Sequence, residues 1–325
     1  MKQVLSRLGQ TAVMLMGLGM LACSSGIDSP RFLSVGTAPP GGAFFVVGGA
    51  IAQVVDAHDK DAGWQVTSEA TKGTQENIRR LAKDELDFAL ANAAISYFAS
   101  RGEGKWDGKQ DIRTVMTLAP NVALFITPKS SGVSTLADLK GKRVVVGPAG
   151  AGFDYFLKPI LKAHGVTYDD FKPLHNTQAG SVDMLADGSA AAAFLGGAVP
   201  TASITQASAS QDIHFIPFDA ESKSKLFTEY PFFSAANIRA DTYRGQSEEF
   251  AGMNVGNMHL ITRASLDEET VYQFTKSLYE NRAEVVKKHP AGRAINPKNI
   301  IRDTGTPFHP GAIRYFKEIG IWPKS

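Results

Sequence analysis

The chain has almost no cysteine and almost no net charge. Cys23 is the only cysteine among 325 residues, which excludes an internal disulfide and a metal cluster built on several thiolates. The formal net charge is +2, and since Lys2 and Arg7 both precede residue 23, the remainder of the chain is neutral. Its basic runs, such as residues 140–143, are short and typical of solvated surface. The composition therefore excludes the basic stripe of a nucleic-acid-binding protein.

Common catalytic and nucleotide-binding motifs are also missing. The glycines of residues 147–152 have the wrong order for a dinucleotide-binding loop, and no Walker lysine follows any glycine-rich turn. Neither G-x-S-x-G nor H-E-x-x-H occurs. The seven histidines are scattered without the spacing of metal ligands. We therefore predict a protein that is not an enzyme and that uses no metal and no cofactor.

Residues 1–22 have the layout of a signal peptide. Two basic residues precede an uncharged apolar run, residues 8–22, which is shorter than the about 20 residues of a transmembrane helix. Cys23 follows directly, at a position that resembles the bacterial lipobox, in which this cysteine becomes the lipidated first residue. We expect export to the periplasm or cell surface, lipid attachment at Cys23 and a linker over residues 23–30. Free secretion and an uncleaved anchor stay open.

Beyond the linker, strand-like runs alternate with helical runs. Expected strands cover residues 31–36, 64–70, 86–91, 112–118, 122–127, 143–147, 190–195, 213–218 and 258–262. Expected helices cover residues 44–57, 74–83, 136–139, 153–164, 181–186, 200–208 and 267–289. The alternation predicts an α/β fold with mostly parallel sheets. Two such series predict two lobes, with chain crossings near 118–124 and 256–260 and a ligand cleft between the lobes.

Three turns share one design: residues 36–42, 69–74 and 147–152 each follow an expected strand and open an expected helix. The start of a helix leaves backbone N–H groups unpaired beside the positive end of the helix dipole, which suits a carboxylate or phosphate. Lys72 lies in the second turn and could neutralise such an anion or simply be exposed. The alternative is that all three turns only reverse the chain.

Two aromatic pairs, Phe44–Phe45 and Phe232–Phe233, invite two interpretations. Each pair could place one ring in the core and the other toward the cleft, or both rings could serve core packing alone.

Six segments, taken in order, resemble the TAXI family of solute receptors of TRAP transporters. They are residues 41–52, 69–77, 136–147, 198–204, 230–233 and 309–317. The resemblance implies a two-lobed, type II-like periplasmic-binding-protein fold with a hinge. Lobe 1 would comprise residues 31–120 and 260–325, and lobe 2 residues 121–259. It also implies capture of a small organic acid, dicarboxylate or amino-acid-like, and delivery to membrane permease subunits driven by an ion gradient.

The expected pocket is less polar than is usual in this family. Ala43 and Phe44 stand where relatives tend to carry Thr and Tyr, and Ala151 and Phe153 replace residues with hydroxyl groups. We therefore expect a less polar organic acid, with Asn92, Asn254 and Asn257 as the remaining amide candidates. The candidate ligand-binding residues are Thr37, Gly41, Gly42, Ala43, Phe44, Thr71, Lys72, Asn92, Gly150, Ala151, Gly152, Phe153, Gly197, Asn254 and Asn257.

The leading interpretation is a monomeric receptor that closes on an anionic solute and hands it to a permease. Two alternatives remain at this point: a receptor that presents its closed shape to a signalling partner, and an exported enzyme acting on small acids. The lack of a nucleophile, base or metal constellation disfavours the enzyme.

Overall fold

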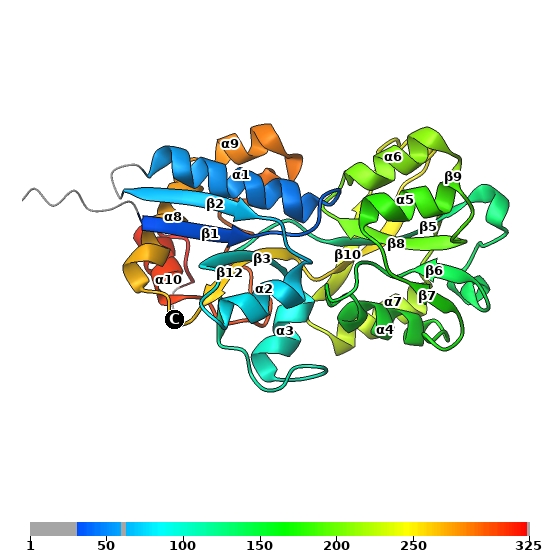
Figure 1. Cartoon of the computed structure of the whole chain (residues 1–325), viewed down its shortest axis with the longest axis horizontal. Helices are drawn as coiled ribbons and strands as arrows, with labels where there is room; N and C mark the ends of the chain where they lie inside the picture. Colours follow the sequence, from blue (N-terminus) through cyan, green and yellow to red (C-terminus); the bar gives the residue numbers. More distant parts are fainter. Residues whose placement is uncertain (1–30, 60–62, 324–325) are drawn as a thin grey trace, which may run out of the picture.

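The computed structural model describes residues 31–59 and 63–323, and these residues form two sheets that lie end to end along the long axis of the molecule (Figure 1). Helices cover both faces of each sheet, so the predicted α/β, two-lobed architecture is confirmed. The predicted signal peptide, the linker and Cys23 lie outside the described residues. The division into lobes at residues 120/121 and 259/260 stays a prediction.

The first sheet has the strand order β2-β1-β3-β12-β4. Its strands are β1 (Arg31–Gly36), β2 (Trp64–Glu69), β3 (Phe88–Asn92), β4 (Ile112–Thr117) and β12 (Met258–Arg263). Its helices are α1 (Ala43–His58), α2 (Thr74–Leu81), α3 (Ala93–Arg101), α8 (Glu268–Glu280), α9 (Arg282–Lys288) and α10 (Pro310–Glu318), with a short 3-10 helix η4 (Pro290–Ala294).

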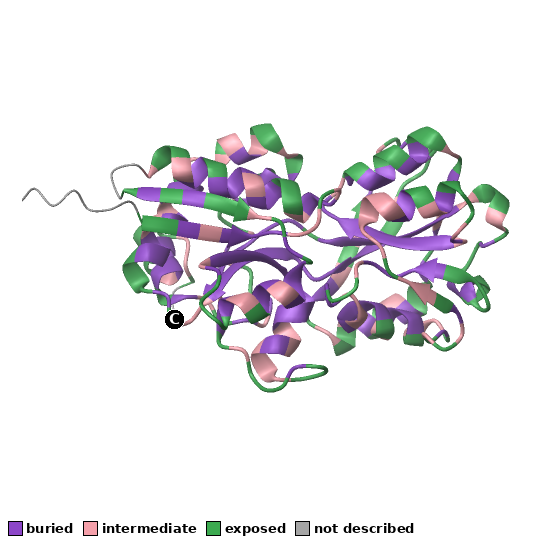
Figure 2. Cartoon of the chain, in the orientation of Figure 1, coloured by how far each residue is buried: buried purple, intermediate pink, exposed green. Residues whose placement is uncertain are grey.

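The second sheet has the order β10-β11-β5-β8-β6-β7, and β9 also pairs with β5. Its strands are β5 (Val122–Pro128), β6 (Arg143–Val145), β7 (Lys172–Leu174), β8 (Ala192–Gly197), β9 (Ile213–Ile216), β10 (Phe233–Ile238) and β11 (Phe250–Val255). Its helices are η2 (Lys129–Ser131), η3 (Leu136–Leu139), α4 (Asp154–Ala163), α5 (Gln178–Ala186), α6 (Ala202–Ser210) and α7 (Ala220–Glu229). Figure 2 shows the strands of both sheets as the most buried part of the molecule.

The prediction of mostly parallel sheets was wrong, because four strand pairs are parallel and six are antiparallel. Five of the six antiparallel pairs involve β5 or β12, the strands that follow a change of lobe, and the sixth joins the consecutive strands β10 and β11. β5 enters the second sheet antiparallel to β8, and β12 returns to the first sheet antiparallel to both β3 and β4. Hydrophobic periodicity reports which face of a strand is buried and carries no information on strand direction.

Other sequence expectations also needed correction. The single helix expected over residues 267–289 is two helices, α8 and α9, because the backbone leaves the helical conformation at Asn281 (φ −101°, ψ 15°). The elements α3, β7, α7, β10, β11 and α10 were not predicted. In α7 only Ser222 and Leu226 are buried, so the helix has no apolar stripe for periodicity to detect.

The two crossings between the sheets run side by side and are joined by asparagine side chains. The first crossing links β4 to β5, and the second links β11 to β12. Asn254 Oδ1 accepts the backbone N–H of Asn121 at 3.0 Å, and Asn257 Nδ2 donates to the Leu118 carbonyl at 2.9 Å. Asn254 Nδ2 also donates to Asn257 Oδ1 at 2.9 Å. All of these groups are buried, so the hydrogen bonds hold the hinge together in a dry environment.

Two neighbouring glycines, Gly48 and Gly49, give a matched test of how closely α1 packs against the residues beside it. A methyl group at Gly48 would lie 2.4 Å from Thr37 Cγ2, and Thr37 cannot turn away freely because its Oγ1 donates to the Glu69 carbonyl at 2.8 Å. At Gly49 the nearest atom, Ser68 Oγ, is 3.8 Å away. We expect Gly49→Ala to raise the free energy of unfolding by about 0.5–1 kcal/mol through helix propensity. Gly48→Ala should instead lower it by about 1–3 kcal/mol through overpacking. Urea unfolding checks both, and an equal gain from the two substitutions would contradict the packing described.

Candidate ligand-binding site

A pocket lies between the two sheets. Its walls follow the carboxyl ends of strands from both sheets, which is the place where open α/β sheets bind ligands. The lining residues are Ala38, Pro39, Gly42, Phe44, Lys72, Gly73, Thr74, Asn92, Asn121, Pro148, Ala151, Phe153, Phe156, Gln178, Phe194 and Gly196.

Three helices begin at this pocket without a side-chain cap. The residues immediately before α1, α2 and α4 are Gly42, Gly73 and Phe153, and all three line the pocket. Glycine and phenylalanine carry no side-chain oxygen, so they cannot accept the free N–H groups of the first turn. The three turns singled out in the sequence therefore meet at one pocket, with the positive ends of three helix dipoles directed at it.

The three helix starts differ in how far acidic residues neutralise them. Glu76 lies in the first turn of α2 and Asp154 in the first turn of α4, whereas α1 has no acidic residue in its first turn. Each helix start also has an N–H that the protein already uses: Phe45 of α1 donates to the Gly42 carbonyl at 3.2 Å, Gln75 of α2 to the Ala151 carbonyl across the cleft at 3.4 Å, and Tyr155 of α4 to the Gly152 carbonyl at 3.1 Å. Because its first turn has no acidic residue, the start of α1 is the least neutralised of the three by charge.

Lys72 is the one charged side chain among the lining residues. It is exposed, and within the described part of the chain it forms no salt bridge. Its backbone N–H donates to Glu76 Oε2 at 3.2 Å, which fixes the turn that carries it. The ammonium group and the helix starts give the pocket a positive potential that suits an anion.

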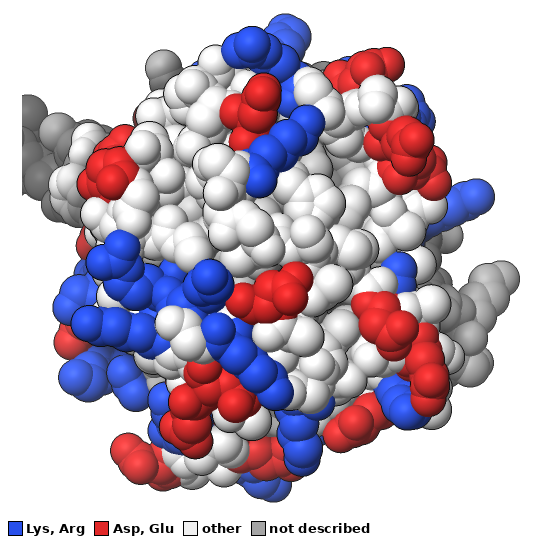
Figure 3. Space-filling view, turned by 90° about the vertical axis from the view of Figure 1, so that its right-hand side faces the viewer, with Lys and Arg blue, Asp and Glu red and all other residues white. Residues whose placement is uncertain are grey.

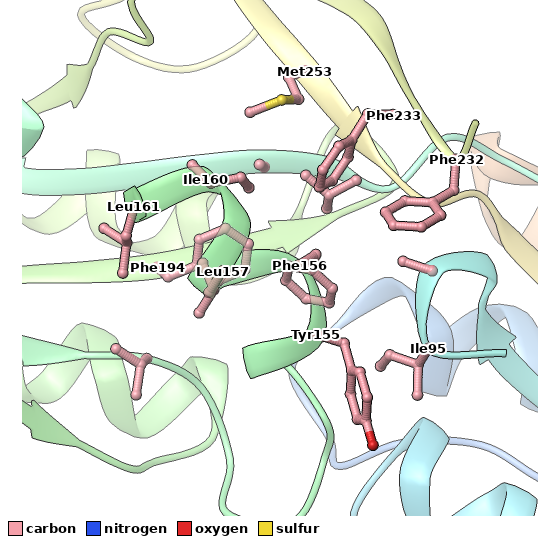
Figure 4. Packing of buried hydrophobic residues seen from close by; sticks show 14 of the residues in the cluster. Ile95, Tyr155, Phe156, Leu157, Ile160, Leu161, Phe194, Phe232, Phe233 and Met253 are labelled. Carbon is pink, nitrogen blue, oxygen red and sulfur yellow. The ribbon is translucent and has the colours of Figure 1, made fainter. Parts of the chain in front are cut away.

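Aromatic rings form the apolar part of the pocket wall. Phe44 comes from α1, Phe156 from α4 and Phe194 from β8, and Phe153 directly precedes α4. The Phe153 and Phe194 rings meet edge to face, with centroids 5.8 Å apart and planes at 85°, and the Phe156 and Phe194 centroids are 5.6 Å apart. Figure 4 shows Phe156 and Phe194 packed together within the core of the second sheet. These contacts fix the rings as a rigid apolar wall.

The aromatic pairs of the sequence now have definite places. Phe44 is half-buried and lines the pocket, while its neighbour Phe45 is 36% exposed on α1. Phe232 and Phe233 are both buried in core packing (Figure 4).

Nine of the predicted ligand-binding residues lie outside the lining: Thr37, Gly41, Ala43, Thr71, Gly150, Gly152, Gly197, Asn254 and Asn257. Thr71 Oγ1 donates to the Thr37 carbonyl and accepts the N–H of Gly73, both at 3.1 Å, so these threonines shape the turns. Gly41 and Gly197 lie where the lobes approach each other, and a methyl group at Gly41 would lie 3.3 Å from Ala179 Cβ. The amides of Asn254 and Asn257 are engaged in the crossings.

The other six predicted residues are in the lining: Gly42, Phe44, Lys72, Asn92, Ala151 and Phe153. Asn92 lines the pocket, but its side chain is fully used inside the protein. Its Oδ1 accepts the N–H groups of Ala94 and Ile95 as the cap of α3, and its Nδ2 donates to the carbonyls of Val255 and Gly256. Its contribution is thus to join α3 to the second crossing.

Sequence reasoning missed two polar residues of the lining that come from the second lobe and from the hinge. Gln178 is the first residue of α5, and its Nε2 donates to the Gly196 carbonyl at 2.6 Å while its Oε1 accepts from Ser203 Oγ at 2.9 Å. The cap residue Thr177 was the available signal for this helix start, since it accepts the N–H of Gly180. Asn121 lies in the first crossing, where no periodicity marks it.

The lobes are in contact at the rim of the cleft. Lys105 Nζ lies 2.6 Å from Asp154 Oδ2, and the backbone N–H of Lys105 donates to the Tyr155 hydroxyl at 3.0 Å. Burial alone would raise the pKa of the Asp154 carboxyl, but the hydrogen bond from Lys105, the bond to its own backbone N–H and the charges of Lys105 and Lys158 together outweigh it, so the net pKa is lowered. Burial raises the pKa of Tyr155, which therefore stays neutral. The Phe98 and Tyr155 rings also meet across the rim at 5.4 Å, and the arrangement is therefore a closed one.

Charge on the outer end of the second lobe is mixed. Figure 3 shows basic side chains gathered on one side of this end, with acidic side chains beside them and broad uncharged areas between. Lys140, Lys142 and Arg143 are exposed at the start of β6. Among the described residues, no helix is both long and apolar enough to cross a membrane, and no group of three or more His, Cys, Asp or Glu residues could hold a metal.

The two sheets, the paired crossings and the pocket between the lobes define the fold of periplasmic solute-binding proteins. Residues 35–320 match the model of the NMT1-like family, and the chain belongs to that family.

Solved structures with low sequence identity share this fold. A protein described as a periplasmic transporter is 14% identical, with a TM-score of 0.55 and coverage of 89% of this chain and 92% of that one. A protein from Bordetella bronchiseptica RB50 is 14% identical, with a TM-score of 0.54 and coverage of 90% of each chain. A binding-protein component of an ABC phosphonate transporter from Pseudomonas aeruginosa is 13% identical, with a TM-score of 0.53 and coverage of 80% of this chain and 79% of that one.

The hydrogen bonds of the Asn92 side chain predict that replacing it destabilises the folded protein. Asn92→Ala would remove the cap of α3 and leave two buried carbonyls without donors, so we expect the free energy of unfolding to fall by about 2–4 kcal/mol. Denaturant unfolding measures this change. Asn237→Ala is the control, because Asn237 is exposed and its amide bonds only the Glu249 side chain. A loss below 1 kcal/mol for Asn92→Ala would contradict the role described.

Proposed function

We propose that this chain is an extracytoplasmic solute-binding receptor that captures a small organic anion in the interlobe pocket and delivers it to a membrane transporter. The observation that carries the proposal is the meeting of three uncapped helix starts and Lys72 at one pocket lined by both lobes. This arrangement stabilises negative charge, and the lining residues include no pair of side chains suited to general acid–base catalysis.

The solute is proposed to be a monocarboxylate with an apolar body. Lys72 supplies one positive charge, which matches one carboxylate better than two. No Asp or Glu is among the lining residues, so an ammonium group would lose its hydration without gaining a carboxylate partner. The rings of Phe153, Phe156 and Phe194 offer an apolar wall for the rest of the molecule. This proposal keeps the less polar organic acid expected from the sequence and departs from the dicarboxylate or amino-acid-like solute that the family resemblance implies.

Capture would proceed by closure of the lobes about the two crossings. The closed arrangement surrounds the solute from both sides, so the solute binds it more tightly than an open one and shifts the equilibrium toward closure. The transporter would then recognise the closed shape.

We also propose that the chain is exported and attached to the membrane by a lipid on Cys23.

For the transporter, we propose a TRAP permease of the TAXI type, on the strength of the six sequence segments named above. An ABC transporter is the second candidate, because one structure with the same fold is the binding component of an ABC phosphonate transporter.

Calorimetry with phenylacetate and glutamate tests the class of solute. Phenylacetate has one carboxylate and an apolar body, and we expect it to bind at least tenfold more tightly than glutamate, because glutamate brings an ammonium group and a second carboxylate that the pocket does not match. Micromolar binding of glutamate without a preference for phenylacetate would overturn this choice of solute.

Lys72→Met should weaken phenylacetate binding about three- to tenfold, a modest effect because the ammonium group is exposed. The salt dependence of binding should fall as well. Lys83→Met removes the same charge from an exposed site at the opposite end of α2 and should leave the affinity unchanged. Equal effects of the two substitutions would show that Lys72 does not contact the anion.

The energy source of uptake, an ion gradient or ATP, distinguishes the two candidate transporters. In cells that express this chain with its permease, uptake of the radiolabelled solute should stop when an ionophore collapses the ion gradient and should continue when arsenate depletes ATP. The reverse pattern would assign the chain to an ABC transporter.

A further inference from the structure

The pocket contains one buried polar side chain with no partner inside the protein. Asn121 is 6% exposed and lines the pocket, yet within the described residues no hydrogen bond reaches its side-chain amide. The amide atoms are not among the fully enclosed unpaired atoms of the described residues, so they face the pocket. A solute that covers them without completing their hydrogen bonds would leave a buried amide unpaired, which is costly. The other lining amides are different. Both polar atoms of the Asn92 amide and both polar atoms of the Gln178 amide already have hydrogen-bond partners in the protein.

The backbone around Asn121 holds this side chain at a fixed place. The N–H of Asn121 donates to Asn254 Oδ1 at 3.0 Å, and its carbonyl accepts the N–H of Val255 at 2.9 Å. Both bonds join the first crossing to the second, so Asn121 sits at the hinge, which the two lobes share. A group on the hinge keeps its position relative to both lobes as they close, which makes it a reference point for the solute.

The amide can both donate and accept hydrogen bonds. Its Nδ2 carries two donors and its Oδ1 two acceptor sites, and a ligand hydroxyl complements both because it accepts one bond and donates another. A carboxylate of the solute would instead favour Lys72 and the helix starts, where the positive charge lies. The lining thus has one anion-binding region, one apolar surface and one neutral side chain without a partner in the protein.

Resting on the proposed function, we infer that Asn121 determines specificity by binding a hydroxyl group on the apolar body of the solute. The solute class is therefore a hydroxy acid with one carboxylate. An acid without the hydroxyl would bury the amide of Asn121 unpaired and bind more weakly. A site that hydrogen-bonds a ligand hydroxyl discriminates strongly against the analogue without it, because the polar group of the protein is then left without a partner.

The test compares mandelate with phenylacetate, which differ by one hydroxyl, by calorimetry on the full chain. Wild-type protein should bind mandelate at least about tenfold more tightly. In Asn121→Leu, a change of similar size, this preference should disappear while phenylacetate still binds, with affinity equal to or better than in wild type. Asn237→Leu, at an exposed site outside the pocket, is the matched control and should keep the preference.

A second variant keeps the test decisive if Asn121→Leu fails to fold. Asn121→Asp preserves the shape of the side chain and adds a negative charge beside the anion, so both acids should bind at least about tenfold more weakly while the midpoint of thermal unfolding stays near that of wild type. Unchanged binding of both acids would mean that Asn121 does not face the solute, and the inference would fall.

The remaining outcomes separate this inference from the function on which it rests. Tight binding of both acids to wild type without a preference would overturn the role of Asn121 and leave the organic-acid receptor standing. The same holds if Asn121→Leu keeps the preference for mandelate. If wild-type protein binds neither acid at millimolar concentration, the proposed monocarboxylate receptor is overturned, and the role of Asn121 falls with it.

Discussion

The unpaired N–H groups at the start of a helix are the constraint on which this structure depends. An α/β sheet places the helix starts at the carboxyl ends of its strands, and the two sheets face each other there. With Gly42, Gly73 and Phe153 before α1, α2 and α4, no side chain completes those groups. The protein thereby keeps a positive region at the pocket, and the start of α1, which has no acidic residue in its first turn, is the least neutralised part of this region.

The hinge and the rim determine how this region opens and closes. Asparagine amides join the two crossings in a buried network, so the two chain segments that link the lobes are held together. At the rim, Lys105 bonds Asp154 and Tyr155, and aromatic rings meet across the lobes. These contacts stabilise the closed arrangement even before a solute contributes, which lowers the binding energy that closure requires from the solute.

Much of the framework could be predicted from the sequence, because glycine turns between apolar runs encode where strands end and helices begin. The same signals located Gly42, Lys72 and Phe153. Strand direction could not be predicted, since β5 and β12 look alike in either orientation. Among the asparagines, the sequence prediction selected Asn92, Asn254 and Asn257, whose amides form hydrogen bonds inside the protein, and it missed Asn121. Residue type says that an amide needs partners, but only the fold shows whether the protein supplies them, as it does for Asn254 and not for Asn121.

The central claim is that the cleft holds one organic anion with a single carboxylate. Mass spectrometry of the chain purified from cells that produce it naturally tests this most directly, first under native conditions to count bound molecules and then after denaturation to identify them. The account predicts one small acid per chain, with one carboxylate and no amine. Recovery of an amino acid or a cation in stoichiometric amount would contradict it.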